Sequence, residues 1–261
     1  MELKDRIVVV TGGGSGIGAA LARRFHAAGA KAIVVVDLDG AKAEAVAKEV
    51  DGRAFTVDVT KEDEVVRLID TVETEVGPID LFCSNAGIGI GRGLEATNAE
   101  WEKIMGVNLY AHVYAARALV PRMVARGGGY LLNTSSAAGL LSQIGSVTYA
   151  VTKHAAVSFA EWVSITHGND GIKVSVLAPQ AVNTPMIAGS EAGGVAGVDG
   201  VMEPEELAEI VMEGLADERF LILPHPVVGE YMQRKAGNID RWLGGMRKLA
   251  DRFGEKAVKA S

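Results

Sequence analysis

Seven short apolar runs alternate with helical segments along this chain. The runs are IVVV (7–10), AIVVV (32–36), AFTVDV (54–59), IDLFCS (79–84), YLLNTS (130–135), IKVSVLA (172–178) and FLILP (220–224). Near-continuous Val, Ile and Leu runs of this length are typical of strands that are buried on both faces, as in a parallel sheet. We therefore expect an α/β fold: a doubly wound Rossmann-type domain whose seven-stranded, mostly parallel sheet has helices on both faces.

Helical periodicity fills the intervals between these runs. Apolar residues recur at helical spacing in segments 16–28, 40–50, 62–76, 98–125, 146–167 and 204–216. No Pro-, Gly- or Ser-rich linker interrupts the alternation, and 261 residues with 48% hydrophobic composition suffice for one large core. The sequence therefore predicts a single domain that spans residues 1–261.

Two segments depart from this alternation. Residues 188–200 are rich in glycine and alanine without clear periodicity, and loops of this length in a compact domain are commonly functional. We expect a substrate lid at about 185–205. Residues 229–261 have helical propensity and become mildly basic toward their end. They predict a helical tail, which is either a solvated surface helix or a binding surface.

The junction of the first strand and the first helix has glycine at five of the seven positions from Gly12 to Gly18. Glycine loses more backbone entropy on folding than any other residue, so this composition needs a reason. The positive N-terminus of a helix binds a pyrophosphate through free N–H groups, provided that no Cβ holds it away. Gly12 would form the tight turn, Gly16 would allow close approach, and Gly18 would let the helix pack on the sheet. A flexible turn is the alternative interpretation.

Asp37 strengthens the dinucleotide interpretation. It ends the second expected strand, 19 residues after Gly18. A carboxylate near this spacing accepts hydrogen bonds from the adenosine ribose hydroxyls. Its charge would repel the 2′-phosphate of NADP, and residues 13–15 and 38–39 include no basic group to neutralise that phosphate. We therefore predict NAD as the cofactor.

Tyr149 and Lys153 lie four residues apart in an expected helix, so they share one face. A neighbouring ammonium group stabilises phenolate and lowers the pKa of a tyrosine from about 10, which allows proton exchange near neutral pH. The spacing alone also fits a surface pair. However, Ser136 stands 13 residues before Tyr149, at the carboxyl end of a strand, where open α/β sheets bind their ligands.

At this point the sequence resembles the short-chain dehydrogenase/reductase family. The resemblance covers residues 5 to about 225 and rests on several motifs in the family's order. They are TGxxxGxG at 11–18, the acidic adenine-binding pair at 58–59, NNAG as SNAG at 84–87, the helix asparagine Asn108 in VNLYA, the serine Ser136, and YxxxK at 149–153.

The resemblance implies a catalytic set of Asn108, Ser136, Tyr149 and Lys153. Tyr149 would be the general acid in carbonyl reduction and the base in alcohol oxidation. Lys153 would lower the pKa of Tyr149 and bind the nicotinamide ribose, and Ser136 would hold the substrate oxygen. Asn108 would keep a water molecule in the proton path through its backbone carbonyl. Ser136 is preferred to Ser135 because its separation from Tyr149 along the chain matches the family.

The resemblance also implies the residues of a cofactor cleft. Asn85 would support the cleft, and the backbone near Val182 would orient the carboxamide together with the Thr184 hydroxyl. No metal is expected, because the nicotinamide itself carries the hydride. The expected cofactor-binding residues are Gly12, Ser15, Gly16, Ile17, Gly18, Asp37, Leu38, Asp58, Val59, Asn85, Ala86, Gly87, Tyr149, Lys153, Pro179, Val182 and Thr184.

Two positions depart from the family pattern. Ser84 replaces the first asparagine of NNAG, which is a mild change, and Gln180 replaces the glycine of the family's PG motif. A side chain at position 180 would narrow the nicotinamide end of the site or touch the substrate.

These residues predict an NAD-dependent oxidoreductase that acts on a secondary alcohol or ketone. The lid segment has few charged residues, which favours a small and largely apolar substrate. A non-catalytic NAD-binding or scaffolding protein on the same fold is the alternative, but it would be expected to lose part of the catalytic set. Epimerisation or dehydration also remains open, although relatives with those activities usually have longer C-terminal substrate regions. A serine hydrolase is disfavoured because the sequence has no GxSxG motif.

Composition bears on partners and location. The chain has 26 basic and 33 acidic residues and a net charge of −7, so no global basic field attracts nucleic acid. No apolar run approaches the roughly 18 residues that span a bilayer, so no membrane association is expected. A single cysteine, Cys83, and the absence of a recognisable signal peptide indicate a cytoplasmic protein.

An apolar stripe on the expected helix 146–167 points to self-association. The stripe is separate from the face that carries Tyr149 and Lys153, and it consists of Val147, Val151, Ser158, Trp162 and Ile165. A helix already packed on a sheet has no need of a second apolar stripe unless another molecule covers it. Members of the resembled family commonly pair this helix across a subunit interface. We predict a homo-oligomer, and specifically a tetramer with two-fold axes.

Overall fold

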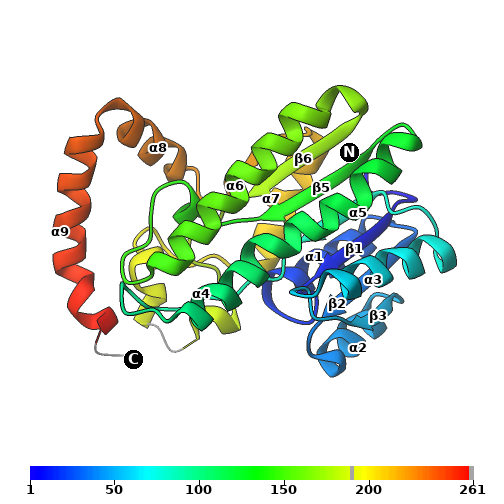
Figure 1. Cartoon of the computed structure of the whole chain (residues 1–261), viewed down its shortest axis with the longest axis horizontal. Helices are drawn as coiled ribbons and strands as arrows, with labels where there is room; N and C mark the ends of the chain where they lie inside the picture. Colours follow the sequence, from blue (N-terminus) through cyan, green and yellow to red (C-terminus); the bar gives the residue numbers. More distant parts are fainter. Residues whose placement is uncertain (189–190, 259–261) are drawn as a thin grey trace.

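The computed structural model describes residues 1–188 and 191–258, which form one parallel sheet flanked by helices (Figure 1). The strands are β1 (Ile7–Thr11), β2 (Ala32–Asp37), β3 (Arg53–Thr56), β4 (Leu81–Ser84), β5 (Gly129–Thr134), β6 (Ile172–Leu177) and β7 (Leu221–Ile222). Their order across the sheet is β3-β2-β1-β4-β5-β6-β7, and every neighbouring pair is parallel. The predicted α/β fold with a seven-stranded sheet is confirmed.

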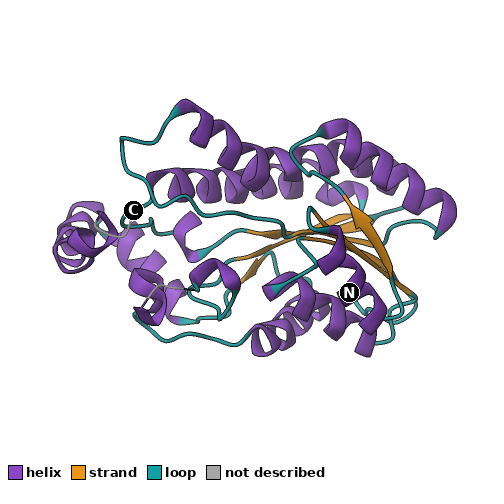
Figure 2. Cartoon of the chain, turned by 90° about the horizontal axis from the view of Figure 1, so that it is seen from below, coloured by secondary structure: helices purple, strands orange, loops and turns teal. Residues whose placement is uncertain are grey.

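Helices cover both faces of this sheet, as the edge-on view in Figure 2 shows. Helices α1 (Gly16–Ala27), α2 (Gly40–Glu49) and α7 (Pro204–Ala216) pack on one face. Helices α3 (Glu62–Glu75), α5 (Ala111–Ala125) and α6 (Val147–His167) pack on the other. The remaining helices are α4 (Asn98–Met105), α8 (Val227–Gly237) and α9 (Ile239–Val258).

The strands are apolar at consecutive positions because both of their faces are buried. In β1, Val8 and Val10 join the core beneath α1 and α7, whereas Ile7 and Val9 join the core beneath α3 and α5. Successive side chains of a strand point to opposite faces, so each face takes every second residue. A polar residue at any of these positions would therefore be buried, which explains the near-continuous apolar runs.

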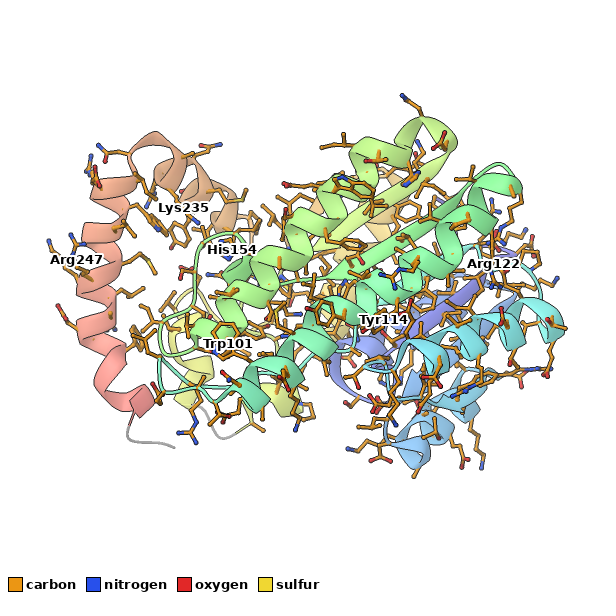
Figure 3. The ribbon with its side chains drawn as sticks, viewed as in Figure 1. Trp101, Tyr114, Arg122, His154, Lys235 and Arg247 are labelled. Atoms are coloured by element: carbon orange, nitrogen blue, oxygen red, sulfur yellow. The ribbon has the colours of Figure 1, made fainter. Side chains whose placement is uncertain are left out.

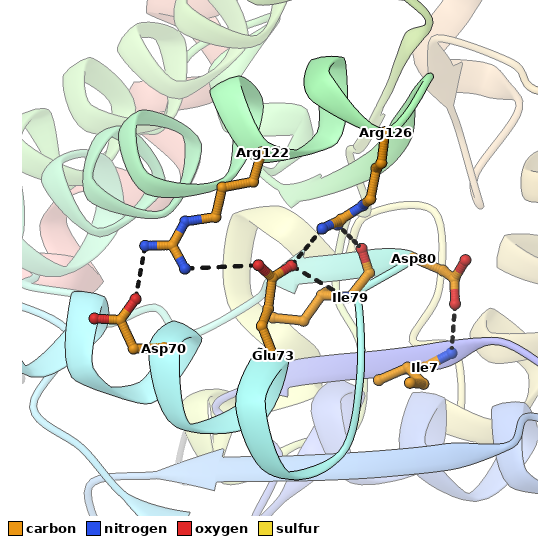
Figure 4. Close-up of polar contacts among 7 residues, drawn as sticks. All are labelled: Ile7, Asp70, Glu73, Ile79, Asp80, Arg122 and Arg126. Carbon is orange, nitrogen blue, oxygen red and sulfur yellow. Dashed lines mark hydrogen bonds and ion pairs between the residues drawn. The ribbon is translucent and has the colours of Figure 1, made fainter.

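Ion pairs on the outside of the molecule join α3 to α5 (Figure 4). Arg122 on α5 lies 2.6 Å from Asp70, and Arg126 lies 2.6 Å from Glu73. Arg126 also donates a hydrogen bond to the carbonyl of Ile79, at the approach to β4. Exposed pairs of this kind contribute little stability each, about 0–1 kcal/mol. Their role here is to fix the direction of α5 against α3.

The strand order places a topological switch between β1 and β4. The chain leaves β1 toward β2 on one side, and later continues from β4 toward β5 on the other. In sheets of this kind, ligands bind beyond the carboxyl ends of the strands at such a switch. The glycine turn after β1, the SNAG turn after β4 and Ser136 after β5 all lie at this edge.

The expected helix 98–125 is not continuous. A π-helical segment, Gly106–Tyr110, separates α4 from α5. The wide turn follows from Asn108 at its centre, whose side chain is buried and bonded to the backbone of Ile88. A π-helical turn replaces i→i+4 bonds by i→i+5 bonds and is frequent at functional sites.

The two edge strands are shorter than the apolar runs indicate. Strand β3 covers Arg53–Thr56 instead of 54–59, and β7 covers Leu221–Ile222 instead of 220–224. Each pairs with only one neighbouring strand, so part of each apolar run lies beyond the ladder.

The expected lid contains short regular turns, and the expected tail is helical. The lid has 3₁₀ turns at Pro185–Ile187 and Glu191–Gly197, while the tail consists of α8 and α9, which break at Asn238. Residues 189–190 of the expected lid and 259–261 of the expected tail lie outside the described residues. Helix α9 extends beside the main body (Figure 1). None of the described helices combines the length and apolar character needed to cross a membrane.

Candidate active site

The glycine turn after β1 forms a cradle that a Cβ would fill. Gly12 and Gly16 adopt φ values of +63° and +50°, which favour glycine. A Cβ on Gly12 would lie 2.9 Å from Cα of Ala86, and one on Gly18 would lie 2.1 Å from the carbonyl oxygen of Gly12. Exposed Ser15 begins α1, and no side chain of the described chain caps the helix there. The free N–H groups of this turn therefore fit a dinucleotide pyrophosphate.

Ile17 and Leu38 differ in burial. Ile17, in the first turn of α1, is half-buried and packs against the core. Leu38, immediately after β2, is 70% exposed. Leu38 follows Asp37, whose carboxylate accepts a hydrogen bond from the N–H of Gly14 in the glycine turn.

The Asp37 carboxylate is held at the end of β2 by backbone donors. It accepts hydrogen bonds from the N–H of Gly14 and the N–H of Asp39, both at 3.0 Å. Lys42 also lies beside Gly14, because a Cβ built on Gly14 would be 2.7 Å from the Cβ of Lys42. The Lys42 ammonium pairs with Asp39 at 3.3 Å. Sequence reasoning missed this lysine; its position in the first turn of the helix after Asp37 is the signal that could have found it.

Asn85 ties together the ends of three strands. Its amide donates to the carbonyl of Thr11 at 3.0 Å, and its amide oxygen accepts from the Thr134 hydroxyl at 3.1 Å. The backbone N–H groups of Asn85 and Ala86 both donate to the Thr11 hydroxyl, at 2.9 and 3.1 Å. These bonds hold the SNAG turn at the switch point. The position of Asn85 is consistent with its expected role of supporting the cofactor cleft.

Asp58 and Val59, the expected adenine-binding pair, follow β3. The Asp58 carboxylate accepts hydrogen bonds from the hydroxyl and the N–H of Thr60, at 2.7 and 3.0 Å, and these bonds lower its pKa. Val59 lines a cavity of about 10 Å³ together with Ala86. Both hydrogen bonds from Thr60 go to Oδ1 of Asp58, while Oδ2 lies 3.7 Å from the Lys61 ammonium, so the carboxylate is held within its own turn.

Lys153 is buried beside the carboxyl end of β5 and is only 2% exposed. Its ammonium donates to the carbonyl of Thr134 at 2.9 Å and lies 5.6 Å from the centre of the Tyr149 ring. A Cβ on Gly87 would lie 3.3 Å from this ammonium, so the SNAG turn ends against it. Burial lowers the pKa of Lys153 to about 8, because the charged form loses its hydration.

The pKa of Tyr149 differs from the sequence expectation. Burial raises the pKa of the phenol above its ordinary value, and the interaction with the Ser136 hydroxyl lowers it by a smaller amount. The predicted net lowering by Lys153 is therefore wrong for this arrangement, in which desolvation of the phenolate is the larger effect. Tyr149 is consequently a neutral phenol at neutral pH, in contact with Ser136.

The two neighbouring serines after β5 have different surroundings. Ser135 is buried and donates to the backbone carbonyl of Lys153 at 2.9 Å. Half-buried Ser136 interacts with Tyr149, donates to the carbonyl of Pro179 at 3.3 Å, and accepts from the N–H of Ala138 at 3.1 Å. Ser136 is thus the serine that shares the cleft with Tyr149.

Asn108 connects the π-helical segment to the chain that follows the SNAG turn and to α6. Its amide oxygen accepts from the N–H of Ile88 at 2.9 Å, and its amide nitrogen donates to the Ile88 carbonyl and to the Thr152 hydroxyl, at 3.0 and 3.2 Å. A Cβ on Gly87 would lie 3.6 Å from the same amide oxygen. Asn108 therefore lies next to Gly87, which also borders Lys153.

The segment after β6 closes the other side of the cleft. Pro179 accepts the bond from Ser136, and the residues flanking Val182 bond to the backbone of Met202. In a bridge of this type, the N–H and C=O of Val182 itself point to the opposite side. Thr184 lies over the glycine turn, since a Cβ on Gly16 would be 2.9 Å from its Cγ2. The expected carboxamide-binding segment thus lies next to the phosphate cradle.

His112 is another residue that sequence reasoning did not place near the site, and unlike Lys42 it is buried. Its Nδ1 lies 2.9 Å from the amide oxygen of Asn133, and its Nε2 has no partner among the described residues. Burial and, to a smaller extent, the charge of Lys153 lower the pKa of His112 to about 3, against the opposing effect of the bond to Asn133. The cavity of about 10 Å³ that it lines has room for roughly one water molecule.

A model of the family described as short chain dehydrogenase matches residues 6–193. This chain belongs to the short-chain dehydrogenase/reductase family. Over 231 residues it is 39% identical to 1-deoxy-11-beta-hydroxypentalenate dehydrogenase of Streptomyces exfoliatus, which covers 85% of this chain and 84% of the relative. Over 196 residues it is 34% identical to meso-2,3-butanediol dehydrogenase of Serratia marcescens, which covers 72% of this chain and 76% of the relative.

Solved structures of the same family match the fold. The short chain dehydrogenase/reductase from Burkholderia phymatum in complex with NAD has a TM-score of 0.84 and 26% identity, covering 92% of this chain and 96% of that chain. This short-chain dehydrogenase/reductase is therefore an oxidoreductase with a Rossmann-like fold.

Proposed function

We propose that this protein is an NAD-dependent dehydrogenase that interconverts a secondary alcohol and its ketone. The observation that carries this proposal is the grouping of Ser136, Tyr149 and Lys153 at one sheet edge, across from the glycine cradle. A non-catalytic protein would have no need of this grouping. Two relatives, the butanediol and the hydroxypentalenate dehydrogenases, act on alcohols according to their names.

The proton chemistry follows from the surroundings of each group. In alcohol oxidation, the hydroxyl of Ser136 holds the substrate oxygen, and Tyr149 takes up the alcohol proton in its phenolate form, after the neutral phenol has released its own proton. Lys153, whose charge is retained below a pH of about 8, stabilises the phenolate that takes up this proton. In the reverse direction, the neutral phenol donates the proton to the ketone oxygen. Bound NAD supplies the hydride acceptor in this scheme.

The cofactor preference depends on two opposed charges. The Asp37 carboxylate, fixed by two backbone donors, favours ribose hydroxyls and disfavours a 2′-phosphate. Lys42 is near enough to moderate this effect, but its ammonium is paired with Asp39. We therefore propose NAD over NADP. The complex of the Burkholderia phymatum relative with NAD supports this choice.

The lid supports a small, largely apolar substrate. Met186, Val198 and Val201 are exposed apolar residues in or beside the 3₁₀ turns of the lid. A cleft whose cover is apolar and whose polar groups are few favours a substrate with one oxygen function on a hydrocarbon frame.

The assembly proposal rests on the outer face of α6. Val151, Trp162 and Ile165 are 45%, 58% and 82% exposed, so the apolar stripe is uncovered in the single chain. We propose a homotetramer in which α6 pairs with a second copy.

We also propose that residues 1–261 form one domain and that the protein is cytoplasmic. The single, buried Cys83 supports the cytoplasmic location.

A panel of secondary alcohols, assayed with NAD, tests the proposed function. We expect oxidation of at least one apolar alcohol, and a fall in turnover of about a hundredfold or more for Tyr149→Phe. The NADH affinity of this variant should stay unchanged, because the phenol oxygen is the only atom removed. A protein that binds NADH but oxidises none of the alcohols would favour the scaffolding alternative.

A further inference from the structure

Gln180 connects the catalytic edge to the lid. Its N–H donates to Nδ1 of His225 at 3.2 Å, and its side-chain Nε2 donates to the carboxylate of Asp199 at 2.8 Å. The preceding residue, Pro179, accepts the hydrogen bond of Ser136. Gln180 therefore connects Pro179, which is bonded to Ser136, with Asp199 in the lid.

Asp199 collects a second donor from the C-terminal region. The hydroxyl of Tyr231 on α8 lies 3.1 and 3.3 Å from its two carboxylate oxygens. The Tyr231 ring lies 6.3 Å from the ring of Trp242 on α9. One carboxylate of the lid is thus bound at once from the end of β6 and from the C-terminal helices.

Helix α8 is itself bonded to the segment that follows Ser136. The Lys235 ammonium donates to the carbonyls of Leu140 and Leu141, at 2.7 and 3.2 Å, in this segment. Figure 3 labels Lys235 on α8. Tyr231 is one helical turn before Lys235, so both side chains belong to the same fixed end of α8. The Tyr231 hydroxyl that bonds to Asp199 therefore belongs to a helix whose position is fixed.

The lid needs such an anchor because its backbone is glycine-rich. Gly193, Gly194 and Gly200 have φ values of +76°, +59° and +105°. Glycine segments gain much backbone entropy when they are released, so a few bonds must oppose their opening. The N–H of Ala181 donates to the carbonyl of Ala196 at 3.2 Å, and Met202 pairs with the backbone of Ala181 and Asn183. Side-chain bonds reach the lid at Asp199, from Gln180 and Tyr231, and at Glu203, from Asn183.

We propose that Gln180, Asp199 and Tyr231 form a polar latch that holds the lid over the substrate end of the cleft. Gln180 is then a positioning residue that determines how tightly the alcohol is bound. This inference rests on the proposed dehydrogenase function. The side-chain oxygen of Gln180 is buried without a partner among the described residues, whereas its Nε2 meets the exposed carboxylate of Asp199. The hydrogen bonds to Asp199 are charge-assisted, because their acceptor is a carboxylate, which makes them stronger than bonds between neutral groups.

Three substitutions test the latch. Gln180→Ala and Tyr231→Phe each remove one donor, and Gln180→Glu sets a second carboxylate against Asp199. We expect KM for the alcohol to rise about tenfold in each, with kcat within about twofold and NADH affinity unchanged. Hydrogen exchange of the amides of residues 193–200 should become several-fold faster, most of all in Gln180→Glu, because like charges repel.

Gln233→Ala is the matched control, because it removes an exposed glutamine from α8 outside the latch. It should leave KM and the exchange rates as in the wild type. Unchanged exchange in Gln180→Ala and Tyr231→Phe overturns the latch. Faster exchange with an unchanged KM overturns the role in substrate binding. If even the wild type oxidises no alcohol, the proposed function fails, whereas the exchange rates still decide whether the latch exists.

Discussion

The ammonium of Lys153 lies 5.6 Å from the centre of the Tyr149 ring while it donates a hydrogen bond to the carbonyl of Thr134 at 2.9 Å. The cation is therefore fixed by the end of β5 instead of moving freely beside the phenol. Burial costs both groups, since it lowers the pKa of Lys153 to about 8 and raises the pKa of Tyr149. Burial therefore opposes formation of the phenolate, and a charged Lys153 at this distance acts in the opposite direction.

Removal of this cation should shift the pH dependence of oxidation. Lys153→Ala makes the phenolate harder to form, so the rising alkaline limb of the oxidation rate should move to higher pH. The difference from the wild type should be largest below a pH of about 8, where Lys153 is charged, and should narrow above it. A pH series of kcat/KM measures this. Lys48→Ala, on exposed α2, is the control and should leave the profile in place.

Cofactor preference should respond in opposite directions to Asp37 and Lys42. The wild type should favour NAD over NADP by at least about tenfold in kcat/KM, roughly 1.4 kcal/mol. Asp37→Ala with Leu38→Arg should erode this preference, because it removes the repelling charge and adds a phosphate-binding one. Lys42→Ala should preserve or increase it. Titration of both cofactors decides, and equal use of NADP by the wild type would contradict the argument from charge.

Acid should destabilise the fold through His112. Its pKa is lowered to about 3 in the folded chain, so the unfolded chain binds more protons between pH 6.5 and 3. Stability is therefore complete above about pH 6.5 and falls as pH decreases, by about 2 kcal/mol at pH 5. His112→Gln should reduce this pH dependence in urea unfolding at pH 7 and pH 5. The exposed His26→Gln control should not.

The proposed assembly can be disrupted on α6. Trp162→Glu combined with Ile165→Glu places charges on residues that are 58% and 82% exposed in the single chain. Light scattering should report a tetramer for the wild type and smaller species for this variant, because the charges oppose burial in a subunit interface. Leu94→Glu, at a residue 99% exposed elsewhere, should keep the wild-type mass. A monomeric wild type at micromolar concentration would refute the proposal.

Local patterns were sufficient for the architecture. The apolar runs predicted β1 to β7 because strands buried on both faces need apolar residues at successive positions, as Val8, Val9 and Val10 illustrate. The glycines could be interpreted for a similar reason, since the conformation at Gly12 and the contact at Gly18 exclude a side chain. The ends of the edge strands were less accurate, because hydrogen bonding to one neighbour decides where a ladder stops.

The sequence by itself determined the order of the elements and the placement of Ser136, Tyr149 and Lys153 on them. Only the tertiary structure decided the balance of burial and charge, which raises the pKa of Tyr149 where the spacing predicted a decrease. It likewise brought Lys42 beside Gly14, and joined Gln180 to Asp199 and Tyr231. Desolvation and long-range hydrogen bonds depend on which residues distant in the chain meet in space, and no local pattern records that.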